Sequence, residues 1–301
     1  MKPFLALPED VRTFSGVYGV DPQHFKKLVL LCEEMFIQVH EVPFAHMVAL
    51  NPKRSTMRFQ TIEHLLQLVL LQLKAGITFD LLGYIFSIDA SNAHEKFQNG
   101  LELLNQALNI EGFIPRRKFR DVDEFNAVFE NETRLIIDGT EQAIQRPMNK
   151  ERQKATYTGK KKRNTLKVLI ISTMDRYIHY VSPVHVGTTS DFRILKEQFL
   201  PGADWFKNFE VYVDLGFVGF DKQYPEIDLT IPHKRKSKTE LTEQQKEENR
   251  QIASQRIRVE HAIGNMKRFD ILSNTCRFHN LDLYDLVVET VAGLSNLRQP
   301  M

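Results

Sequence analysis

The stretch Leu135-Ile136-Ile137-Asp138-Gly139-Thr140 places an acid directly after an aliphatic run and directly before a glycine. A similar stretch, Val211-Tyr212-Val213-Asp214-Leu215-Gly216, follows further along the chain. Short, nearly continuous aliphatic runs are typical of strands that are covered on both faces of a sheet. Open α/β sheets place ligand-handling groups beyond the carboxyl ends of such strands. The two stretches therefore predict strands that end in the candidate functional residues Asp138 and Asp214, although an acid in this position is also common as a turn or capping residue.

The chain around these stretches has the pattern of a mixed α/β domain. Further strands are predicted over residues 167–172, 177–181 and 229–231, and helices over residues 191–199 and about 242–269. Before residue 110 the pattern is helical, with Leu/Ile-rich or amphipathic segments over residues 60–73, 79–86 and up to 108. We therefore expect a helical N-terminal domain over residues 1–115 and an α/β domain over residues 116–301.

Glu260 is a third candidate, on the long predicted helix. The helical period places Arg256, Glu260, Gly264 and Lys267 on one face, and a carboxylate between two cations fits a site that meets an anionic polymer. Two aspartates on strands and one glutamate on a helix are all oxygen ligands, which favours Mg²⁺ or Mn²⁺ over zinc. Two such ions about 4 Å apart would clamp an in-line phosphoryl transfer. A plain surface ion pair between Arg256 and Glu260 is the alternative.

The composition is that of a globular protein. The chain has 301 residues, of which 42% are hydrophobic and 26% charged, which excludes disordered, collagen-like and coiled-coil chains. Its two cysteines can form neither a disulfide framework nor a cysteine-based zinc site, and they fit a reducing compartment. The N-terminus lacks the apolar core of a signal peptide, and the most apolar stretch, residues 65–73, is too short to span a bilayer. We therefore expect a cytoplasmic protein.

Positive charge is concentrated in the second half of the chain. Residues 1–132 contain 13 Lys and Arg against 17 Asp and Glu, whereas residues 133–301 contain 27 against 21. Residues 150–167 alone carry eight Lys and Arg and one Glu, together with Tyr157 and Gly159. Such a segment is either a loop that binds a DNA backbone or a solvated surface loop, and composition alone does not decide between them.

Residues 82–97 resemble a helix-turn-helix, with a small residue, a short turn that contains a central apolar residue, and a second helix capped by Asp89 or Ser91. In such modules the start of the second helix faces the major groove. That position would present Ser91 and Asn92 to DNA. Because this helix carries few cations, a purely structural or dimerising helical domain is the alternative.

Five segments occur in an order that is characteristic of one family. They are Ile137-Asp138-Gly139-Thr140-Glu141, the basic block of residues 157–167, Val213-Asp214-Leu215-Gly216-Phe217-Val218-Gly219, Ile231-Pro232-His233-Lys234, and residues 256–269. This ordered set, over roughly residues 45–298, resembles the bacterial insertion-sequence transposases of the DDE superfamily (insertion-sequence family five, related to harbinger-like DDE endonucleases). Each motif alone is weak, whereas the ordered set is specific.

The resemblance implies an RNase H-like mixed sheet flanked by helices, preceded by an all-α domain with a helix-turn-helix-like segment. The family's three catalytic and metal-binding acids map onto Asp138, Asp214 and Glu260. Its Arg-x-x-x-Glu signature is present as Arg256 to Glu260, and its later basic residue is Lys267. Asp191 matches a recurrent acid of the family, and we interpret it as supporting the site rather than binding metal.

The implied function is transposition: metal-dependent DNA cleavage at the ends of an insertion sequence, followed by strand transfer. The expected cofactor is Mg²⁺ or Mn²⁺, two ions, and the expected partner is double-stranded DNA, bound by a homo-oligomer in the bacterial nucleoid without any membrane partner. Contacts to DNA are expected from Lys160, Lys161, Lys162, Arg163, Lys167, Arg256, Lys267, Ser91 and Asn92. A non-catalytic DNA-binding protein derived from a transposase, and a DDE nuclease without strand transfer, remain as alternatives.

Overall fold

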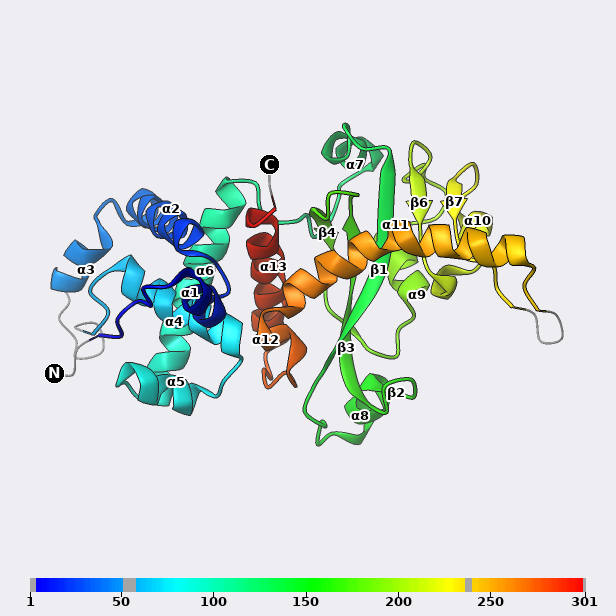
Figure 1. The fold of residues 1–301 in the computed structure, drawn as a ribbon. Coiled ribbons are helices and arrows are strands. Elements are labelled where there is room, and N and C mark those ends of the chain that lie inside the picture. The colour runs from blue at the N-terminus through cyan, green and yellow to red at the C-terminus, as the bar shows by residue number, and fades with distance from the viewer. Residues whose placement is uncertain (1–3, 51–57, 236–239, 300–301) are drawn as a thin grey trace. The chain divides into compact units, whose positions relative to one another are not determined.

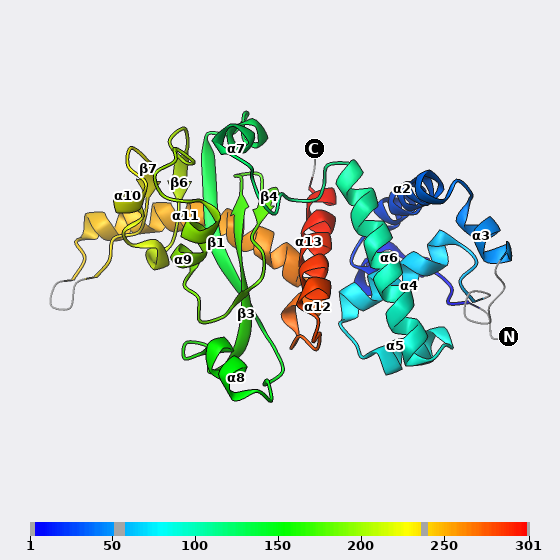
Figure 2. The same ribbon diagram turned by 180° about the vertical axis from the view of Figure 1, so that it is seen from behind.

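The chain folds into two compact units, each described by itself below (Figures 1 and 2). The computed structural model describes residues 4–50, 58–235 and 240–299. The helical unit comprises Met1–Ile114 and Met266–Pro300, and the sheet unit comprises Pro115–Asn265. No helix within the described ranges is long and apolar enough to cross a membrane.

A mixed sheet forms the centre of the sheet unit. Its strands are β1 (Arg134–Ala143), β2 (Tyr157–Thr158), β3 (Arg163–Ser172), β4 (Ile178–Val181), β5 (His185–Val186), β6 (Glu210–Tyr212) and β7 (Asp228–Thr230). The order is β2-β3-β1-β6-β7, with β4 and β5 also paired to β3. β1 is antiparallel to β3 and parallel to β6. The predicted α/β class, an RNase H-like mixed sheet flanked by helices, is confirmed.

Helices cover both faces of this sheet. They are α7 (Val122–Val128), α8 (Lys150–Thr156), α9 (Asp191–Gln198), the short 3₁₀ helix η2 (Leu215–Phe217), α10 (Phe220–Gln223) and α11 (Glu243–Lys267). Successive side chains of a strand point to opposite faces. Leu135 and Ile137 of β1 therefore join the buried core that includes residues of α9 and α10, whereas Asp138 meets Arg256 of α11. Long α11 crosses the sheet on this second face, with α9 and α10 on the other (Figures 1 and 2).

The helical unit is a bundle around the long helix α6. Its elements are α1 (Val11–Tyr18), α2 (Pro22–His40), α3 (Phe44–Leu50), α4 (Ile62–Ala75), α5 (Phe79–Phe86), α6 (Ala90–Ile110), α12 (Asp270–Ser273) and α13 (Leu281–Leu297). α2, α4, α5 and α13 all pack against α6. The helices predicted over residues 60–73, 79–86 and up to 108 correspond to α4, α5 and α6.

The C-terminal segment departs from the expected division, which assigned all of residues 116–301 to the α/β domain. Residues 266–300 belong instead to the helical unit. The amide of Asn105 donates to the Thr290 hydroxyl at 3.1 Å, and that of Asn296 to the Phe113 carbonyl at 2.9 Å. A Cβ at Gly293 would lie 2.6 Å from Ile114 Cδ1, so this glycine permits the close approach of α13. The apolar face of α13 is buried among helices that lie far away in sequence, which no local pattern reveals.

Candidate active site and nucleic-acid interface

Asp138 and Asp214 lie where β1 and β6 separate. These two parallel strands pair as far as Ile136 and Tyr212, and each aspartate follows two residues later in its own segment. The prediction that a strand ends at the acid holds for Asp214, which follows β6, but it is wrong for Asp138, because β1 stays paired with β3 up to Ala143. Asp214 also caps η2, because its Oδ1 accepts a hydrogen bond from the Gly216 N–H at 2.7 Å. The capping interpretation therefore holds for Asp214, and it fixes one oxygen of the carboxylate while the residue stays partly exposed.

The Asp138 carboxylate is largely buried, with 17% of its side chain exposed. Its Oδ1 accepts a hydrogen bond from the Gly139 N–H at 2.8 Å. The pKa of Asp138 is raised to about 6, mainly by burial and to a smaller extent by the neighbouring carboxylates of Asp214 and Asp191, against the opposing effects of Arg256 and the Gly139 hydrogen bond. The carboxylates of Asp214 and Asp191 thus lie close enough to Asp138 to disfavour its ionised form.

Arg256 of α11 supplies the counter-charge. Its Nη2 lies 3.5 Å from Asp138 Oδ2, and 15% of its side chain is exposed. Its Nε is buried, and within the described part of the chain it has no hydrogen-bond partner. The sequence predicted a DNA contact for Arg256. The structure places this guanidinium beside the Asp138 carboxylate. Its Nε–H remains available as a hydrogen-bond donor.

Glu260 does not complete a cluster with the two aspartates. It lies one helical turn after Arg256 and is exposed, whereas its neighbour Val259 is buried. Across the described residues, no group of three acidic, histidine or cysteine side chains is arranged to hold a metal ion. α11 therefore presents Arg256, rather than Glu260, to Asp138.

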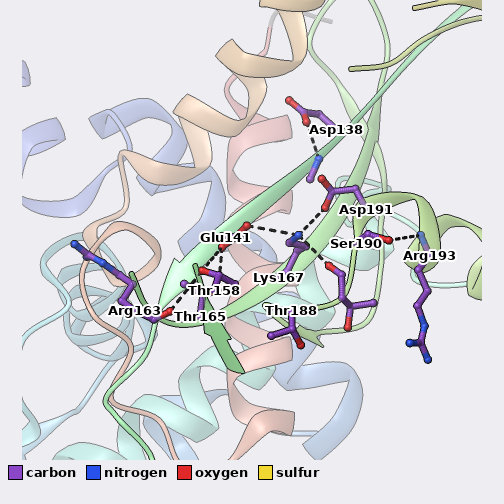
Figure 3. A network of polar contacts seen from close by, with 12 residues as sticks. Asp138, Glu141, Thr158, Arg163, Thr165, Lys167, Thr188, Ser190, Asp191 and Arg193 are labelled. Atoms are coloured by element: carbon purple, nitrogen blue, oxygen red, sulfur yellow. Dashed lines mark hydrogen bonds and ion pairs between the residues drawn. The ribbon is translucent and has the colours of Figure 1, made fainter. Parts of the chain in front are cut away.

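Lys167 and Asp191 form a polar network beside Asp138 (Figure 3). Lys167 Nζ lies 3.0 Å from Asp191 Oδ1 and 3.5 Å from Glu141 Oε1, and it donates to the Thr189 carbonyl at 3.0 Å. Glu141 in turn accepts from the Thr165 hydroxyl at 3.0 Å. A Cβ at residue 139 would overlap the Asp191 carboxylate, which explains the glycine after Asp138.

This network changes the interpretation of Lys167, which the sequence predicted to contact DNA. Only 9% of its side chain is exposed, and strand register places it directly opposite Glu141. A buried ammonium needs counter-charges and hydrogen bonds, and Glu141, Asp191 and the Thr189 carbonyl provide them for Lys167. The network supports the expectation that Asp191 contacts protein groups near the site. Glu141 was not predicted as a site residue from the sequence, although this acid lies only three residues after Asp138.

The turn between α5 and α6 is tight. The Ser87 backbone is left-handed, with φ 57°, and the Ile88 N–H donates to the Gly83 carbonyl at 2.9 Å. A Cβ on Gly83 would lie 2.7 Å from the Ile88 carbonyl oxygen, so only glycine fits there. Asp89 caps α6 by accepting from the Asn92 N–H at 2.8 Å. Ser91 is exposed, whereas the Asn92 amide is engaged by the Asp89 carboxylate.

Comparison with known protein families assigns the chain to one of them. Residues 137–296 match the family model of the DDE superfamily endonuclease, which is more than half of the chain. The chain belongs to this DDE superfamily. Residues 61–110 match the helix-turn-helix of DDE superfamily endonucleases, so the predicted helix-turn-helix is confirmed and extends over α4, α5 and α6.

This DDE-superfamily chain is also similar to a probable transposase for insertion sequence element IS702 from Microchaete diplosiphon. The two are 30% identical over 171 residues, which is 55% of this chain and 57% of that relative. The chain thus matches little more than half of the relative's length. No solved structure matches the chain.

The remaining predicted DNA contacts of this DDE protein lie on basic segments. Lys160, Lys161 and Lys162 are exposed in the turn before β3, and Arg163 is exposed at its first residue. Lys162 has a left-handed backbone, with φ 52°, which shapes this turn. Lys267 ends α11, is partly buried and belongs to the helical unit.

Proposed function

We propose that this chain is a transposase that cleaves DNA at the ends of an insertion sequence and joins the freed strand to target DNA. The observation that carries this proposal is the buried carboxylate of Asp138, coupled to Asp214 and Asp191 where two parallel strands separate. Membership of the DDE superfamily supports the same chemistry. The alignment with a probable transposase supports the same substrate class.

The donor set fits hard divalent cations. Asp138 and Asp214 offer only oxygen ligands, which suit Mg²⁺ or Mn²⁺. Mutual repulsion and burial disfavour the ionised form of Asp138, and a bound cation would relieve both. Asp138 and Asp214 would hold the first of two ions, and Glu260 would join them through an adjustment of α11. Bound ions would activate the attacking oxygen and stabilise the leaving oxygen of an in-line displacement.

The chain's own groups would bind and orient the DNA. Arg256 would turn its free Nε donor toward a phosphate oxygen beside Asp138, because guanidinium groups recognise phosphates well. The exposed residues Lys160, Lys161, Lys162 and Arg163 would contact the backbone. The helix-turn-helix would read the terminal inverted repeats from the start of α6, and paired ends would bring two or more copies of the chain together.

The deciding experiment uses duplex DNA that carries the genomic ends of the element. We expect Asp138→Asn and Glu260→Gln to bind these ends as the unchanged protein does, and to lose cleavage in Mg²⁺ by about 10³-fold or more, since metal sites contribute several kcal/mol. Asp221→Asn is the matched control, because Asp221 is an exposed acid of α10. Cleavage by Asp138→Asn at the unchanged rate would remove the assignment.

The separation of Glu260 from the two aspartates favours one alternative, a non-catalytic DNA-binding protein derived from a transposase. Absence of Mg²⁺-dependent cutting of the element ends by the purified chain would establish that alternative. Pre-cleaved ends test the second alternative: a nuclease without strand transfer would leave their 3′-hydroxyls unjoined to target DNA.

A further inference from the structure

A cavity of about 650 Å³ lies in the sheet unit, where β1 ends and β3 begins. Its walls include Arg146, Lys154, Tyr157, Lys162 and Arg163. We propose that this cavity binds one unpaired nucleotide of DNA, with the base against Tyr157 and the phosphates on the cations. This proposal rests on the proposed function and names a nucleotide-binding subsite of the same protein.

The wall of the cavity is held in place by hydrogen bonds. The Asn164 amide donates to the Gln153 carbonyl and to the Thr156 hydroxyl, both at 2.8 Å. The Thr188 hydroxyl donates to the Ala155 carbonyl at 2.6 Å. These bonds tie α8 to β3 and to the loop after β5, so the wall of the cavity is fixed by the fold itself.

The positive charge of the cavity favours an anionic ligand. Four cations line it and no acidic residue does. Among the residues that the structure describes, none of these four cations forms an ion pair, and Arg146 contacts only the neutral Gln153 side chain, at 3.3 Å. Clustered cations repel one another in the absence of counter-charges, and DNA phosphates would supply such charges.

The aromatic wall distinguishes a nucleotide from a bare phosphate. Tyr157 is 48% exposed, and the nearest basic residues along the chain, Lys154 and Lys160, lie three positions to either side of it. Proteins that bind single-stranded nucleic acid combine a positive groove with exposed aromatic rings on which bases stack. A volume of this size is within the range of ordinary ligand pockets. A duplex that contacts only exposed lysines would need neither the ring nor the cavity.

Strand geometry predicts where the unpaired nucleotide lies. The cavity residue Ile144 follows Asp138 by six positions, and β1 is continuous up to Ala143. At about 3.3 Å per residue, the cavity is at most about 20 Å from Asp138. DNA rises about 3.4 Å per nucleotide of one strand, so the bound nucleotide would lie within about six positions of the cleaved phosphate.

The test measures binding without cleavage, in Asp138→Asn and without divalent metal. Two kinds of probe are compared: a fully paired duplex of an element end, and the same duplex with one nucleotide placed opposite an abasic site, at each position up to about six from the break in turn. We expect the second kind to bind more tightly at one position, and 2-aminopurine at that position to be quenched by the protein. Tyr157→Ala should abolish the quenching and weaken this probe by about 5- to 150-fold, while it leaves the paired duplex unchanged.

Controls separate stacking from charge. Tyr157→Phe should keep the preference, because the ring remains. Lys154→Ala should weaken binding of the unpaired-nucleotide probe, whereas Arg152→Ala, exposed on the same helix outside the cavity, should weaken it less. Equal effects of Tyr157→Ala on both probes, or no effect on either, would overturn the proposal. Because metal-dependent cleavage by the unchanged chain is assayed separately, the subsite can fail while the proposed function stands, and the reverse.

Discussion

Lys167 and Lys161 belong to one basic stretch of sequence but lie in opposite environments. Lys167, on β3, is buried between Glu141 and Asp191, as Figure 3 shows. Lys161 is exposed in the turn that leads into β3. The charge density of a segment therefore does not reveal which of its cations can reach DNA. Strand register decides this, because it sets which side chains meet a carboxylate inside the fold.

The largest effect should come from the candidate active-site acids, which lie near the buried Lys167 network rather than near the exposed turn of Lys161. We expect Asp214→Asn to lower Mg²⁺-dependent cleavage of the element ends by about 10³-fold or more, since a carboxylate lost from a metal site removes several kcal/mol of transition-state stabilisation. DNA binding should persist. Gel-based cleavage and binding assays measure both, and Asp228→Asn, an exposed acid on β7, serves as the control. Retained cleavage would exclude Asp214 from the active site.

The second effect concerns the stability that Lys167 provides. Removing one partner of a buried ion pair leaves the other charges uncompensated and costs about 3–5 kcal/mol. We therefore expect Lys167→Met to lower the free energy of unfolding by this amount in urea titrations. Lys161→Met should change it by less than about 0.5 kcal/mol, as is usual for surface substitutions. Equal effects of the two substitutions would refute the distinction between the two lysines.

A third, smaller effect is a pH-dependent gain in stability. Because the pKa of Asp138 is raised from 3.8 to about 6, its neutral form is favoured in the folded state, and the associated stability is lost as the pH rises through 6. In metal-free protein, Asp138→Asn should therefore be more stable than the unchanged chain above pH 6, by up to about 3 kcal/mol. The gain should disappear below about pH 4. Thermal unfolding in EDTA across this pH range provides the measurement, and a constant difference would contradict it.

The smallest effect concerns the exposed cations. Replacing Lys160, Lys161 and Lys162 by alanine should weaken DNA binding and reduce the slope of log K against log salt by up to about 2.7, since each phosphate contact contributes about 0.9. The fold should remain unchanged, because the three side chains are exposed. Fluorescence anisotropy at several salt concentrations checks the slope. An unchanged slope would mean that this turn does not contact the backbone.

Much of the fold could be predicted because its signals are local. The aliphatic runs before Asp138 and Asp214 became β1 and β6, and Asp89, one of the two predicted capping residues, caps α6. α13 could not be placed in this way. Its apolar face fits a sheet as well as a helical bundle, and only its packing against α6 determined its partner.

In the candidate site, too, some features follow from local sequence and others only from packing between distant segments. The sequence by itself determined which residues carry the charges, where most strands and helices form, and which acids could offer oxygen ligands. Only the tertiary structure decided that Asp138 meets Arg256 rather than Glu260, and that Lys167 is enclosed by Glu141 and Asp191. The physical reason is range: backbone propensity acts over a few residues, whereas the pairing of buried charges depends on strand register and helix rotation between segments far apart in the chain.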